Sequence, residues 1–183
     1  MSFNIEVKAF EDGDKRIIEG WATRPQEDRS GDIVIPTGVK YQLPLPFLLD
    51  HDPEKAVGSV DKVEVSDKGI RFVASVRKID NDTSVARACD NAWTLLKNNL
   101  RNHVSIGFRT LAYEIREPRG WVIKEWEWLE LSAVTIPALP TAAITGLKKY
   151  GDAPIQAGGT VKLVEASKVL PKGCFHLVSN PCA

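Results

Sequence analysis

Hydrophobic and polar residues alternate over much of this chain, with the period of half-buried strands. Apolar side chains occupy every second position from Phe3 to Ala9, and a strand-like run resumes over residues 17–22 after a turn at residues 12–14. A second pair of alternating runs covers 57–65 and 70–76, on either side of a polar turn ending in Gly69. Two hairpins are therefore predicted.

Proline and glycine interrupt the pattern between these hairpins. Residues 24–38 are rich in turn formers and predict a loop around a short segment at 33–35. Residues 43–49 carry Pro44 and Pro46, which predict an edge strand or irregular structure because proline cannot donate to a sheet ladder.

One segment has the three- and four-residue spacing of an amphipathic helix. Asp82 or Thr83 is the expected N-cap, since either side chain accepts backbone N–H bonds. The apolar positions expected to face the core are Val85, Ala88, Cys89, Ala92, Leu95, Leu96 and Leu100.

Three further strand-like runs follow, at 104–115, 121–128 and 129–136. The predicted fold class is mainly β with packed helices (α+β), as a small barrel or a sandwich rather than a parallel α/β sheet. The domain is expected to cover residues 1–147. Residues 148–183 begin with a Gly/Ala/Pro-rich linker and predict a tail, with one strand at most over 161–164.

Composition narrows the functional class. The 183 residues carry 24 basic and 24 acidic side chains, and this balance argues against nucleic-acid binding. Without an apolar run of about 18 residues, no membrane span is expected. The N-terminus does not have the pattern of a signal peptide, and three cysteines do not form a disulfide framework. A cytoplasmic site of action is therefore expected.

Two short segments carry the candidate chemistry. His51 lies between Asp50 and Asp52, and Ser105 lies in an apolar run two residues before Gly107. A serine hydroxyl becomes a nucleophile when an imidazole takes its proton and a third group fixes that imidazole. On spacing alone, a solvated loop histidine and a structural serine are the more common explanation of these residues. His103 shares a strand face with Ser105.

Other clusters favour simpler roles. Cys174, His176 and Cys182 give three candidate ligands where structural zinc needs four, and adjacent residues such as those around His51 rarely meet at one ion. Neither a metal nor a cofactor is predicted. The tryptophans at 121, 126 and 128 alternate with glutamates, which favours core packing over base stacking.

Five segments in this order resemble the prohead (capsid maturation) serine proteases of tailed bacteriophages, a family related to herpesvirus assemblin. The resemblance covers residues 3–147. Its segments are Ile18–Thr23, Gly31–Pro36, Leu48–Asp52 with Val57–Gly58, Ser105–Phe108, and Leu129–Ala138. The chain departs from the family pattern at Pro36–Val39 and Lys55–Gly58, which affects loop detail and substrate preference.

The resemblance implies an assemblin-like β-barrel, closed or partly open, and a serine endopeptidase that works through an acyl-enzyme. It gives His51 as the base, Ser105 as the nucleophile and Glu130 as the third member. His103, Asp50 and Asp52 remain alternatives for that third role. Backbone N–H groups near Ser105, with Arg101 or Arg109, are the expected oxyanion donors.

The resemblance also implies partners and a location. The substrates would be the major capsid protein, scaffold segments or both, and a homo-oligomer is allowed. The enzyme would be phage- or prophage-encoded and act in the host cytoplasm, inside the assembling prohead. The tail would serve as a targeting or self-processed segment. The alternative function is a non-catalytic capsid-assembly or scaffold module on the same fold.

Overall fold

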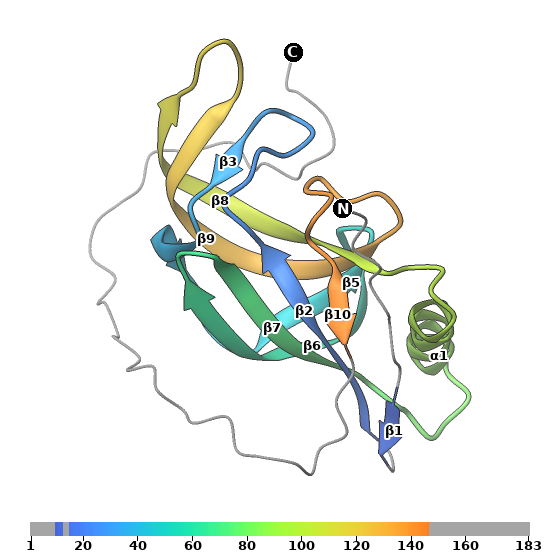
Figure 1. The fold of residues 1–183 in the computed structure, drawn as a ribbon. Helices are drawn as coiled ribbons and strands as arrows, with labels where there is room; N and C mark the ends of the chain where they lie inside the picture. Colours follow the sequence, from blue (N-terminus) through green and yellow to red (C-terminus); the bar gives the residue numbers. More distant parts are fainter. Residues whose placement is uncertain (1–9, 13–14, 147–183) are drawn as a thin grey trace.

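The computed structural model describes residues 10–12 and 15–146, and the fold is a strongly curved β-sheet with one α-helix beside it (Figure 1). The elements in chain order are β1 (Phe10–Asp12), β2 (Lys15–Thr23), β3 (Ile33–Val34), the 3₁₀ turn η1 (Pro36–Gly38), β4 (Val39–Lys40), β5 (Leu45–Leu49), β6 (Asp52–Ser66), β7 (Gly69–Val76), α1 (Ser84–Lys97), β8 (His103–Ile115), β9 (Trp121–Val134) and β10 (Ile144–Gly146). The mainly β prediction is confirmed. More than one packed helix was predicted, whereas the described residues contain one α-helix.

The sheet has the strand order β1–β2–β7–β6–β5–β9–β3, with β10 added to β2 and β4 and β8 added to β9. A closed barrel is not confirmed, because the strand ladders of the described ranges leave the sheet open. Only isolated contacts bridge the seam near β10: Val104 donates to the Ala142 carbonyl at 3.1 Å, and Ile144 donates to that of Asn102 at 3.1 Å.

The long strand β9 is the centre of the site's architecture. On one edge it pairs antiparallel with β8, and on the other it pairs in succession with the parallel strands β3, β4 and β5. The prediction of separate runs at 121–128 and 129–136 is wrong, since one strand spans both. Leu129 is an extra residue at a register shift, between the pairs Phe108–Trp128 and Gly107–Glu130, and this bulge interrupts the alternation.

Strand β5 lies inside the sheet, between β6 and β9, so the expected edge strand is wrong. Its prolines are compatible with this place because pairing with β9 covers only Phe47 to Leu49. Pro46 precedes that stretch, where its missing N–H removes no bond to β9. The turn at residues 50–51 follows β5 directly and leads into β6, whose Asp52 pairs with Leu49.

Helix α1 begins after Thr83, whose hydroxyl accepts from the Ala86 N–H at 3.1 Å. The helix packs against β6, and the Cys89 thiol donates to the Val57 carbonyl at 3.6 Å. Its buried side chains are Ala86, Cys89, Ala92, Trp93 and Leu96. The core-facing side of the helix differs from the predicted one. Val85 and Leu100 are exposed, while Ala86 and the large Trp93 are buried against the core.

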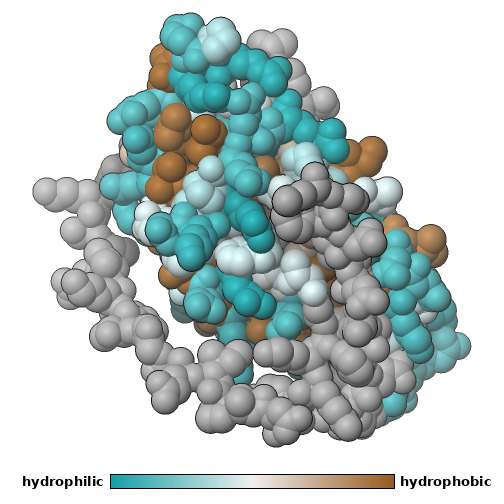
Figure 2. Space-filling view, viewed as in Figure 1, coloured by the Kyte–Doolittle hydropathy of each residue, from teal (hydrophilic) through white to brown (hydrophobic). Residues whose placement is uncertain are grey.

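The tryptophans of β9 pack as predicted. Trp126 and Trp128 are fully buried, and Trp126 meets Phe108 edge-on at 5.4 Å between ring centroids. Tyr113 and Trp121 stack near the tip of the β8–β9 hairpin. Figure 2 shows small hydrophobic groups among hydrophilic residues on this face.

None of the described helices has the length and apolar content to cross a membrane. The tail beginning at residue 148 and its strand at 161–164 lie outside the described residues.

Candidate active site

His51 is placed by a two-residue turn. Strands β5 and β6 form a hairpin in which Leu49 pairs with Asp52, so Asp50 and His51 are its loop. Both have positive φ, at 55° and 59°, as a type I′ turn requires. Such turns favour Asn-Gly, and a side chain with a Cβ is strained there by about 1–2 kcal/mol per residue. The surrounding contacts must therefore hold this turn.

Those contacts come from the end of β9. The Asp50 N–H donates to the Ala133 carbonyl at 3.2 Å, and the His51 N–H donates to Ser132 Oγ at 3.0 Å. Arg101 contacts both the turn and β9: it forms an ion pair with Asp50 at 2.7 Å and donates a hydrogen bond to the Ala133 carbonyl at 3.2 Å. The turn is thereby fixed against the strand that carries Glu130.

Glu130 meets the His51 ring. Its Oε1 lies 2.7 Å from His51 Nδ1, and its Oε2 accepts from the Ser132 hydroxyl at 2.7 Å. The Glu130 backbone is held as well, because the Trp128 indole N–H donates to its carbonyl at 2.7 Å. Glu130 is 8% exposed and the His51 side chain 12%, so water competes little for these bonds.

This network assigns the protons. An ionised carboxylate only accepts, so the hydrogen between Glu130 and His51 belongs to Nδ1 of the neutral ring. Nε2 then carries the lone pair and can take a proton from a third group. A buried carboxylate facing the ring would also stabilise the imidazolium formed by that transfer. The pair therefore has the chemistry of a general base with its orienting group.

Ser105 lies on the same face of the sheet as this pair. It is directly opposite Ser132, and Gly107 is directly opposite Glu130. Side chains of directly paired residues point to one face, with Cβ atoms roughly 5 Å apart. Ser105 is 5% exposed. Within residues 15–146 its hydroxyl makes no hydrogen bond, and contacts of this kind often form only when substrate binds.

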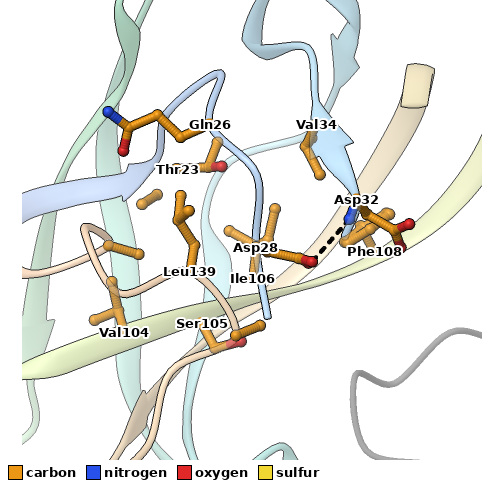
Figure 3. A pocket seen from close by; sticks show the side chains of 13 residues that line it. Thr23, Gln26, Asp28, Asp32, Val34, Val104, Ser105, Ile106, Phe108 and Leu139 are labelled. Carbon is orange, nitrogen blue, oxygen red and sulfur yellow. Dashed lines mark hydrogen bonds between the residues drawn. The ribbon is translucent and has the colours of Figure 1, made fainter. Parts of the chain in front are cut away.

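A small pocket adjoins Ser105. Figure 3 shows Val104 and Ser105 of β8 on one side of it, and Asp28 and Asp32 of the loop before β3 on another. Asp28 Oδ1 accepts the N–H groups of Ser30 and Asp32 at 2.8 and 2.9 Å. Burial raises the pKa of the Asp28 carboxyl. The remaining lining is mostly apolar and includes Ile106 and Phe108. Because Val104, Ile106 and Phe108 alternate with Ser105 along β8, the pocket lies on the core face of the strand, opposite the face that Ser105 shares with Glu130.

The acidic alternatives for the third role lie elsewhere. Asp50 pairs with Arg101, and Asp52 pairs with Lys55 at 2.8 Å. His103 pairs in the sheet with Val134, and its Nδ1 is buried with no partner in the described part of the chain. Burial, with a smaller contribution from Arg29, lowers its pKa. Of these candidates, Glu130 is the one whose side chain bonds the His51 ring.

Both arginines suggested as oxyanion donors are engaged. Arg101 holds the turn through Asp50, and Arg109 forms an ion pair with Glu127. Among the residues placed by the structure, no group of three or more His, Cys, Asp or Glu side chains is arranged to hold a metal ion. Cys174, His176 and Cys182 lie outside those residues.

Sequence reasoning missed Ser132. The residue was visible within Leu129–Ala138, two positions after Glu130, and that spacing places both side chains on one strand face. What the sequence did not show was the pairing of β5 with β9, which brings the His51 turn onto the same face.

A histidine bound to a carboxylate through one ring nitrogen is one part of the triad of serine hydrolases. The chain belongs to the caudovirus prohead serine protease family, whose sequence model matches residues 3–153.

The chain is also similar to one capsid polyprotein and, more distantly, to one solved structure. The chain is 37% identical over 171 residues to a capsid polyprotein of Pseudomonas phage PAJU2, covering 92% of this chain and 25% of that protein. It thus spans about a quarter of that relative's length. The solved structure of varicella-zoster virus protease gives a TM-score of 0.35 at 15% identity, over 61% of this chain and 56% of that one, a likeness too weak to define fold or function.

Proposed function

We propose that this chain is a serine endopeptidase in which Ser105 is the nucleophile, His51 the general base and Glu130 the orienting carboxylate. The observation that carries the proposal is the 2.7 Å contact of His51 Nδ1 with Glu130 Oε1, on the face that Ser105 shares. Membership of the prohead serine protease family supports the same chemistry.

The reaction follows from the proton positions. His51 Nε2 takes the hydroxyl proton as Ser105 Oγ bonds to the scissile carbonyl carbon, and the imidazolium then returns that proton to the leaving amine as the C–N bond breaks. Water, deprotonated by the same Nε2, releases the acyl group and restores the hydroxyl. Glu130 stays ionised throughout and stabilises the transient imidazolium. Backbone N–H groups near Ser105 would bind the oxyanion, since both nearby arginines are occupied.

The proposed substrates are capsid-protein or scaffold segments, cleaved within an assembling phage head in the host cytoplasm. The similarity to a protein named capsid polyprotein supports that choice.

Co-expression with the cognate capsid protein tests the proposal. Wild type is compared with Ser105→Ala, His51→Ala and the control Ser59→Ala, which removes the hydroxyl of another buried strand serine. The capsid protein should be shortened with wild type and Ser59→Ala, and should keep its full length with the other variants. Equal cleavage by all four would refute the assignment. Capsid assembly without cleavage by any of them would instead favour a non-catalytic module.

A further inference from the structure

Ser132 contacts both members of the His51–Glu130 pair. Its hydroxyl donates to Glu130 Oε2 at 2.7 Å and accepts the His51 backbone N–H at 3.0 Å. The side chain is fully buried on β9. A single oxygen atom thus joins the carboxylate to the backbone of the histidine turn.

We propose that Ser132 is a positioning residue, which acts through His51 and Glu130 rather than on the substrate. This inference rests on the proposed function of that pair. A carboxylate bonded by one oxygen can still rotate about its terminal C–C bond, since such torsions have broad energy wells. A donor fixed on the second oxygen removes that freedom and leaves Oε1 facing Nδ1.

The second contact acts on the turn. His51 has a φ of 59°, which a residue with a Cβ adopts only when its surroundings hold it there. The bond from its N–H to Ser132 Oγ is one of those restraints. Losing the hydroxyl would leave a buried N–H without its acceptor and a buried carboxylate with one donor fewer.

The direction of each bond also matters. A hydroxyl has one hydrogen, and the ionised Glu130 accepts it because a carboxylate has none to give. The lone pairs of Ser132 Oγ are then available to the His51 N–H.

Proton NMR of the full chain with ¹⁵N-labelled histidine tests this role independently of activity. The chain has only three histidines, so His51→Ala assigns the His51 Nδ1 proton, which a short bond to a carboxylate moves far downfield. Ser132→Ala should shift that resonance upfield or broaden it by exchange with water. Ser59→Ala is the control, because Ser59 is also a buried strand serine donating to a carboxylate, that of Asp61, at 2.7 Å.

Capsid-protein cleavage gives the second readout. Ser132→Ala should lower kcat about 10- to 100-fold, the rate equivalent of one hydrogen bond to a charged group, with KM unchanged. Should it not fold, Ser132→Cys replaces it, since a thiol is a weak donor. An unchanged His51 signal overturns the positioning role and leaves the proposed function standing. A shifted signal with unchanged kcat shows instead that cleavage does not use the pair.

Discussion

Gly107 lies directly opposite Glu130 in the β8–β9 pair, and a Cβ atom at position 107 would come within 2.0 Å of Glu130 Oε1. The glycine that follows Ser105 thus makes room for the carboxylate that meets His51.

Gly107→Ala should therefore impair activity more than folding. The added methyl meets the Glu130 side chain as far back as Cγ, at 2.8 Å, so that side chain must move, and the movement breaks the 2.7 Å contact with His51 Nδ1. We expect cleavage to fall at least tenfold, for the loss of about 1.4 kcal/mol or more of this charge-assisted contact. Urea unfolding should show a loss of only about 1 kcal/mol.

Gly58→Ala provides the contrast. A Cβ there would lie 1.8 Å from the Ser75 carbonyl oxygen, which is backbone and cannot rotate away. This variant should lose more stability than Gly107→Ala. Equal losses of stability and activity in both would contradict the assignment of Gly107 to the site.

Glu130→Gln tests the third member directly. The amide keeps the size of the side chain and removes the charge that orients the ring and stabilises the imidazolium. Turnover should fall by about 10² to 10⁴. The lower figure corresponds to the loss of one hydrogen bond to a charged group, and the higher one to an imidazole held in the wrong tautomer. Circular dichroism should show an intact fold. If turnover is unchanged, the same measurement on Asp50→Asn, Asp52→Asn and His103→Gln identifies the replacement.

The Arg101–Asp50 ion pair should be coupled to the histidine turn. Arg101→Gln, Asp50→Asn and the double variant form a double-mutant cycle, read by urea unfolding. The Arg101 side chain is 17% exposed and Asp50 is 47% exposed, so we expect a coupling free energy of only about 0.5–1 kcal/mol. Strictly additive losses would show that the two side chains hold the turn independently.

His103 should make stability depend on pH. Burial lowers its pKa in the folded protein, so below pH 6.5 the unfolded chain binds the proton more tightly. The free energy of unfolding should decrease as the pH falls from 6.5 toward 5, and His103→Gln should reduce that slope. At pH 8 the ring is neutral in both states, so any difference there measures packing alone. Parallel curves for the two proteins over pH 5–8 would contradict this prediction.

The sequence predicted the parts of this fold that local pattern controls. Alternation located β2, β6 and β7, and the helix was found with its cap at Thr83. Prediction from the sequence failed where contacts between residues far apart in the chain determine the structure. The core face of α1 includes Trp93 because β6 and β7 lie against it, and β5 lies inside the sheet because β9 reaches it across more than 80 residues of chain.

The residues of the site also divide into those that the sequence identified and those that only the tertiary structure revealed. His51, Ser105 and Glu130 were named through an ordered resemblance, whereas Ser132 and the support from Arg101 depend on the pairing of β5 with β9. The left-handed turn at residues 50–51 has no glycine to mark it. A hairpin of that length could be identified only once Leu49 and Asp52 were known to pair.

The parallel pairing of β5 with β9 has a consequence for the order of synthesis. His51 and Glu130 are 79 residues apart, and Ser105 lies between them in the chain. A ribosome has already made Ser105 and His51, the proposed nucleophile and base, when β9 is still missing. The emerging chain therefore carries both side chains without Glu130, the carboxylate that contacts the His51 ring. The proposed site is complete only when this last long strand has been added.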